Sequence, residues 1–96
     1  MLYAIICNDK KDHLHIRLDI RPKHLDYLKS LGKTLKFAGP FLDDNEKPDG
    51  TLIVVEAKSL EEAKSFAEND PYAKAGLFSD MKIRRWRWGV NNPEEV

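Results

Sequence analysis

The sequence predicts a small α+β domain whose elements follow one another as strand, helix, strand, strand, helix, strand. Three observations lead to this prediction. Short apolar runs alternate with segments whose apolar residues have helical spacing, glycine and proline mark the joins between them, and 96 residues suffice for one domain. We therefore expect one domain over residues 1–88 and a polar tail over residues 89–96.

The first half of the chain predicts a strand, a long connection and a helix. Residues 2–7 are apolar on both alternating faces, which is typical of a buried strand. Residues 8–20 are expected as an extended connection, because every second residue from Leu14 to Ile20 is apolar. Pro22 suits the first turn of a helix, and leucines at helical spacing run on to Gly32, so the helix is expected over 21–31.

The second half predicts a hairpin, a helix and a last strand. Strands are expected over 34–41 and 51–57, joined by a turn-rich charged loop over 43–50. Ser59 followed by Glu62 is a capping-box pattern that begins a second helix. Asp70-Pro71 ends this helix, one further turn is expected within 71–76, and the last strand is expected over 78–88.

This order of elements is that of the split β-α-β, or ferredoxin-like, arrangement, in which the first and third strands lie in the middle of the sheet. Those two strands, 2–7 and 51–57, are the ones with apolar residues on both faces. Two helices cover one face of such a sheet, so the other face needs a cover. We expect a homodimer with the sheets face to face, and Trp86 and Trp88 would add apolar surface to one of the two faces.

Composition excludes several classes of function. Sixteen basic residues balance sixteen acidic ones, so no overall charge favours nucleic acid or an anionic membrane, and neither is expected as a partner. The single cysteine, Cys7, excludes a disulfide framework and is expected to be buried. Neither a signal peptide nor a membrane span is evident, which predicts a cytoplasmic protein. No motif calls for a cofactor or a metal, and none is expected.

The strand directions of this topology bring four chain segments to one end of the sheet, so His24 and Asp70 are expected to be neighbours. An aspartate bonded to one imidazole nitrogen leaves the other free as a general acid or base. His24 is expected in the first helical turn, beside unpaired backbone N–H groups. Arg17 and Arg21 flank this end and suit a carboxylate or phosphate. In the alternative interpretation, His24 only packs beside its helix and Asp70 only ends the next one.

Two other patterns carry weaker hypotheses. His13 and His15 lie on one side of the expected connection and suit a metal, but only Asp9 or Asp12 stand nearby as further ligands, so a solvated loop is the alternative. The run from Arg84 to Trp88 mixes basic and aromatic residues in the way that single-stranded nucleic acid needs. Against this, the third strand carries no aromatic residue.

Several short strings resemble the YciI-like (YCII-related) family over about residues 1–88: Leu2-Tyr3-Ala4-Ile5-Ile6, Arg21-Pro22-Lys23-His24-Leu25, Phe37-Ala38-Gly39-Pro40 and Glu68-Asn69-Asp70-Pro71-Tyr72. The resemblance implies a ferredoxin-like fold that dimerises into an α/β barrel. It also implies an active site in which a histidine and an aspartate match His24 and Asp70, with Arg21, Gly39, Pro40 and Tyr72 lining the same pocket. The segment 43–49 departs from the family, whose members often carry a longer glycine- and serine-rich insert.

Three functions remain open at this point. The first is a small cofactor-free enzyme of the lyase or hydrolase type, in which His24 moves a proton, Asp70 orients it, and Arg17, Arg21 and Tyr72 hold a small anionic or aromatic metabolite. The second is a non-catalytic dimeric module that binds a small molecule or a protein through the same pocket. The third is an oxygenase or a haem-handling protein, for which no axial-ligand arrangement is evident.

Overall fold

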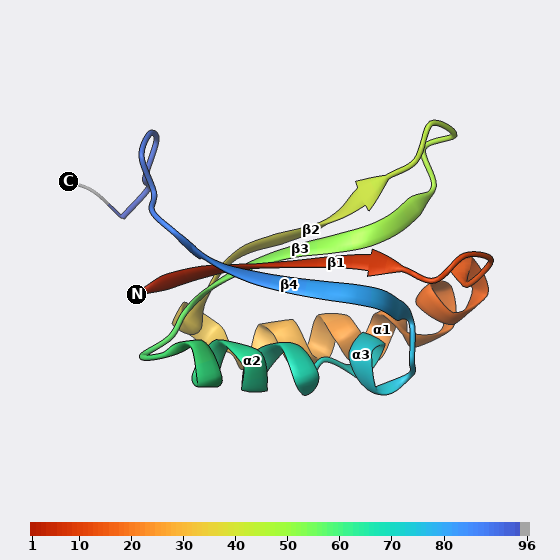
Figure 1. Cartoon of the computed structure of the whole chain (residues 1–96), viewed down its shortest axis with the longest axis horizontal. Coiled ribbons are helices and arrows are strands. Elements are labelled where there is room, and N and C mark those ends of the chain that lie inside the picture. Colours follow the sequence, from red (N-terminus) through yellow and green to blue (C-terminus); the bar gives the residue numbers. More distant parts are fainter. Residues whose placement is uncertain (95–96) are drawn as a thin grey trace.

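Four strands form one antiparallel sheet, and every helix lies against the same face of it (Figure 1). The computed structural model describes residues 1–94. The strands are β1 (Leu2–Asp9), β2 (Leu35–Leu42), β3 (Pro48–Glu56) and β4 (Phe78–Trp86), and the helices are α1 (Leu14–Ser30), α2 (Leu60–Glu68) and α3 (Pro71–Lys74). The order in the sheet is β2-β3-β1-β4, with β1 and β3 in the middle. The predicted ferredoxin-like α+β class is confirmed.

The core lies between the sheet and the helices. From β1, Tyr3, Ile5 and Cys7 point into it, and they meet Ile53 and Val55 of the neighbouring β3. The helices contribute Leu28 of α1 and two small residues of α2, Ala63 and Ala67, which let that helix approach β1 closely. The buried apolar face of each central strand therefore fixes its register against both neighbours.

The second helix forms as its sequence predicts. The hydroxyl of Ser59 accepts a hydrogen bond from the backbone N–H of Glu62 at 3.2 Å, which satisfies one of the free donors of the first turn. The Glu62 carboxylate in turn accepts from the backbone N–H of Lys58 at 3.3 Å. The predicted turn after Asp70-Pro71 is α3, with Pro71 in its first turn.

The expectation of an extended connection over residues 8–20 is wrong from Leu14 onward. This segment is the beginning of α1, which starts at Leu14 and contains Pro22 in its interior rather than in its first turn. Leu18, one of the alternating apolar residues, is 58% exposed on the helix surface. Pro22 is also exposed, so the carbonyl that its missing N–H leaves free can be solvated, and the helix continues past it.

The face of the sheet away from the helices is called here the open face. It carries Leu2, Ala4 and Ile6 of β1 and Leu52 and Val54 of β3, since these alternate with the core residues. Trp86 and Trp88 gather over it with Phe37, with ring centroids between 5.3 and 5.5 Å apart. Both the β2–β3 hairpin tip and the C-terminal segment project on this side of the sheet (Figure 1).

The other boundaries differ from the predictions by a few residues. β3 begins at Pro48, inside the expected loop, and β4 ends at Trp86 rather than Trp88. In the predicted tail, Glu94 pairs with Lys36 at 2.9 Å, while residues 95 and 96 lie outside the described part of the chain. Within residues 1–94, no helix has the length and apolar character needed to cross a bilayer.

Candidate active site

Helix α1 presents three of the predicted site residues on one face. Arg17, Arg21 and His24 follow one another at spacings of four and three residues, which places them side by side along a helix, and Leu28 continues the row into the core. Arg17 and His24 are only 3% and 6% exposed. His24 lies well inside α1, so the expectation that it stands in the first turn, beside unpaired backbone N–H groups, is wrong.

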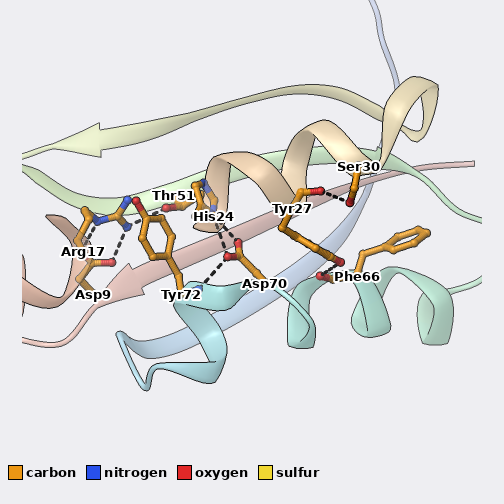
Figure 2. Close-up of polar contacts among 9 residues, drawn as sticks. All are labelled: Asp9, Arg17, His24, Tyr27, Ser30, Thr51, Phe66, Asp70 and Tyr72. Carbon is orange, nitrogen blue, oxygen red and sulfur yellow. Dashed lines mark hydrogen bonds and ion pairs between the residues drawn. The ribbon is translucent and has the colours of Figure 1, made fainter. Parts of the chain in front are cut away.

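The structure brings His24 and Asp70 together across 46 positions of sequence (Figure 2). The imidazole Nδ1 lies 2.8 Å from one carboxylate oxygen of Asp70 and 3.0 Å from the other. Asp70 is 1% exposed and also caps α3 by accepting a hydrogen bond from the backbone N–H of Tyr72 at 2.9 Å. An ionised carboxylate here requires the proton on Nδ1, so the neutral imidazole has its lone pair on Nε2.

The Tyr72 ring stacks on the His24 ring, with centroids 3.9 Å apart and planes 19° from parallel. The guanidinium carbon of Arg17 also lies over the Tyr72 ring, 4.6 Å from its centroid. Burial raises the pKa of Tyr72, although the charges of Arg17 and Arg21 oppose this change. The phenol therefore stays protonated at neutral pH. The stacking of the two rings limits rotation of the imidazole.

Arg17 is held by two residues to which the sequence analysis gave no such role. Its Nε and Nη2 donate to the two carboxylate oxygens of Asp9, each at 2.7 Å, and Nη2 also donates to the Thr51 hydroxyl at 2.7 Å (Figure 2). Burial acts to lower the pKa of Arg17, but the hydrogen bonds and charge of Asp9 outweigh it and raise that pKa above its usual value. The guanidinium is permanently charged.

A pocket of about 260 Å³ opens where these groups meet. Its walls come from α1, the exit of β2, the entry of β3 and the first turn of α3, which are the segments that the topology predicts to converge. The predicted substrate-binding residues Arg17, Arg21, Gly39, Pro40 and Tyr72 all line this pocket, as do His24 and several apolar residues. Asp70 lies behind His24, in the protein interior.

The remaining candidates lie apart from this pocket. His13 and His15 have ring centroids 6.0 Å apart, and the first bonds to the backbone carbonyl of Lys11 at 2.8 Å. Within residues 1–94, no group of three or more histidine, cysteine, aspartate or glutamate side chains is arranged to hold a metal ion. Burial, with a smaller contribution from the charge of Asp70, raises the pKa of Cys7 to about 12, so its thiol is not a nucleophile at neutral pH.

Fold and pocket together define a class: small ferredoxin-like domains with a histidine–aspartate pair at the end of the sheet. A family model described as the YCII-related domain matches residues 1–87, and the chain belongs to this family. It is 36% identical to protein YciI of Escherichia coli, in a match that covers 91% of this chain and 97% of that protein.

Solved structures share the fold of this chain. The 5-chloro-2-hydroxyhydroquinone dehydrochlorinase of Burkholderia phenoliruptrix, solved in complex with 2,5-dihydroxybenzoquinone, is 37% identical; the match covers 93% of this chain and 96% of that one, with a TM-score of 0.85. A NIPSNAP family protein of Agrobacterium tumefaciens shares 14% identity at a TM-score of 0.58, covering 98% of this chain and 97% of the other, and shows the fold alone.

Proposed function

We propose that this protein is a small lyase-type enzyme in which His24 transfers a proton to or from a small, oxygen-bearing ring compound. One observation carries the proposal: His24 Nδ1 is engaged by the buried Asp70, while Nε2 has no hydrogen-bond partner within residues 1–94 and its ring lines the pocket. A base held in one tautomer beside a cavity is the arrangement that general acid–base catalysis needs.

The substrate class follows from the pocket walls and from the related dehydrochlorinase. A volume of about 260 Å³ suits a single substituted ring, and Leu18, Leu25 and Pro40 offer apolar contacts to it. Arg17 and Arg21 offer donors for anionic oxygens. The similarity to an enzyme that acts on a chlorinated hydroxyhydroquinone and binds a dihydroxybenzoquinone favours phenolic or quinonoid substrates over phosphate esters.

In the elimination that this arrangement supports, the proton, the electron pair and the leaving group can all be accounted for. His24 Nε2 accepts a proton from a substrate O–H or C–H group, and the electrons of that bond form a new double bond within the ring system. The leaving group departs with its bonding pair from a tetrahedral ring carbon, as chloride would from the keto tautomer of a chlorinated phenol, in which a hydroxyl proton has moved to the chlorine-bearing carbon. Asp70 holds the resulting imidazolium in place until it gives the proton to water.

The test compares wild type with His24→Asn, in which the amide nitrogen is close to the position of Nδ1 and continues to donate to Asp70, while Nε2 is lost. We expect wild type to release chloride from 5-chloro-2-hydroxyhydroquinone. The variant is expected to do so ~10²–10⁴ times more slowly, while it binds 2,5-dihydroxybenzoquinone within a few-fold of wild type. Equal rates would contradict the role of His24. Binding without turnover in wild type would support a non-catalytic small-molecule module instead.

We also propose that the functional unit is a homodimer formed by two open faces. In the single chain this face carries apolar residues of both central strands that are only partly buried, beside the Trp86–Trp88 cluster. They are Leu2, Ile6 and Leu52. Apolar area of this kind on a small domain is typical of a surface that another chain covers. The pocket lies on the helical side of the sheet, so each copy keeps its own site.

A further inference from the structure

We propose that Asp9 and Thr51 are positioning residues that hold the Arg17 guanidinium with one nitrogen, Nη1, presented to a substrate oxygen in the pocket. The inference rests on the proposed function, since it assumes that the pocket binds an oxygen-bearing ligand. It assigns different roles to the two arginines: Arg17 donates a hydrogen bond in a fixed direction, and Arg21 supplies positive charge.

The hydrogen bonds of Arg17 to Asp9 and Thr51 do not use one of its nitrogens, Nη1. Asp9 accepts from Nε and Nη2, and Thr51 accepts from Nη2, so both hydrogens of Nη2 and the hydrogen of Nε are engaged. Nη1 donates to neither Asp9 nor Thr51, although a contact between Arg17 and the Tyr72 hydroxyl also helps to raise the pKa of Arg17, and within residues 1–94 no buried side-chain nitrogen or oxygen lacks a partner. Nη1 is therefore accessible, and the opening that reaches it is the pocket that Arg17 lines.

Contacts with Asp9 and Tyr72 hold this guanidinium in place. Arg17 and Asp9 side chains are 4% and 5% exposed, and their two parallel contacts form the planar, two-point pairing that arginine makes with a carboxylate. The Tyr72 ring, 4.6 Å from the guanidinium carbon, limits movement on one side. The Arg17 guanidinium and the His24 imidazole thus both contact the Tyr72 ring, so a ligand oxygen bonded to Nη1 has a defined position relative to the base.

The charges explain why two arginines line one small pocket. Asp9 neutralises Arg17, so Arg17 contributes direction but little net charge. Arg21 is exposed and has no ion pair within the described residues, so its charge remains available to the ligand. A ring compound with one ionised oxygen near Arg21 and a second oxygen on Arg17 Nη1 matches this division. As a structural device alone, a buried ion pair adds little stability over apolar packing.

The test measures the affinity of 2,5-dihydroxybenzoquinone for wild type, Asp9→Asn, Thr51→Val, Arg17→Met and the double variant Asp9→Asn/Arg17→Met. Loss of one charge-assisted hydrogen bond costs about tenfold in affinity or more. We expect about this loss for Asp9→Asn and Arg17→Met, and a smaller one for Thr51→Val, which keeps the ion pair and so protects the fold. Asn8→Ala is the matched control, because the Asn8 side chain bonds to Asp80 on the open face at 2.9 Å and makes no hydrogen bond to either arginine within residues 1–94.

The double variant separates positioning from a general structural effect. If Asp9 acts through Arg17, the double variant binds the quinone no more weakly than Arg17→Met alone, within about twofold. Losses that add in the double variant overturn the proposal, as does a wild-type affinity in both Asp9→Asn and Thr51→Val.

A measurement without ligand separates a failure of the positioning role from a failure of the proposed function. In nitrogen-15 spectra, we expect the Nε–H of Arg17 to give a sharp, slowly exchanging signal in wild type and Asn8→Ala that is lost in Asp9→Asn. If that signal is sharp and depends on Asp9 but the quinone does not bind, the substrate class is wrong and the positioning role stands. If the signal is averaged with solvent in wild type, the positioning role is overturned.

Discussion

Replacing Asp70 tests whether one carboxylate serves both the fold and the proposed chemistry. The side chain is 1% exposed and accepts hydrogen bonds from His24 Nδ1 and from the backbone N–H of Tyr72. In Asp70→Ala both donors lose their partner. The lost helix cap costs about 1 kcal/mol, and a buried, unpaired imidazole N–H costs about 1–3 kcal/mol.

The expected loss for Asp70→Ala is therefore about 3 kcal/mol in the free energy of unfolding. For a domain of this size that loss lowers the urea midpoint by about 2 M. In Asp70→Asn the amide oxygen still caps Tyr72, and the amide nitrogen can donate to Nδ1, so we expect stability within about 1 kcal/mol of wild type. That donation moves the imidazole proton to Nε2 and removes the base from the pocket.

The two variants thus separate folding from catalysis. Urea denaturation, monitored by circular dichroism, measures folding stability. Chloride release from 5-chloro-2-hydroxyhydroquinone measures catalysis. We expect Asp70→Asn to fold normally and to lose ~10²–10⁴ in rate. A wild-type midpoint for Asp70→Ala would refute the hydrogen-bonding argument. A wild-type rate for Asp70→Asn would refute the argument from the tautomer.

Three further predictions concern the core, one strand pairing and the open face. The pKa of Cys7 rises from 9.0 to about 12, chiefly because the thiol is buried, so the native thiol should resist iodoacetamide at pH 9. The unfolded thiol ionises first, so the free energy of unfolding should fall by up to about 1.4 kcal/mol per pH unit above pH 9, less so in Cys7→Ala. A methyl group on Gly50 would lie 2.6 Å from the Cys7 carbonyl oxygen, whereas nothing lies within 4 Å of one on Gly39. Gly50→Ala should therefore lose about 1–3 kcal/mol of stability in urea melts, and an equal result for Gly39→Ala would contradict the close approach. Leu52→Asp should convert a sedimenting dimer to a monomer, and a wild-type protein that sediments as a monomer at micromolar concentration would remove the dimer proposal.

Strand order and the place of the site were predictable because they follow from patterns that chain topology constrains. Apolar residues on both faces of residues 2–7 and 51–57 indicated the central strands, and the sheet has β1 and β3 there. Strand directions then put His24 and Asp70 at the same end, where the imidazole and carboxylate lie 2.8 Å apart. The partners of Arg17 were not predictable in the same way. Asp9 ends β1 and Thr51 lies within β3, and only the true start of α1 aims Arg17 at them.

The helix whose start was predicted wrongly is the one that carries the pocket, and the reason is physical. Helix α2 buries only apolar residues on its inner face and has a capped first turn, so pattern and structure agree. Helix α1 buries Arg17 and His24 on its inner face and leaves Leu18 exposed, which removes the amphipathic pattern that marks a helix. The informative signal was the spacing of the polar residues Arg17, Arg21 and His24 themselves. A row of ionisable residues at helical spacing indicates a helix face when the chemistry, rather than the core, occupies that face.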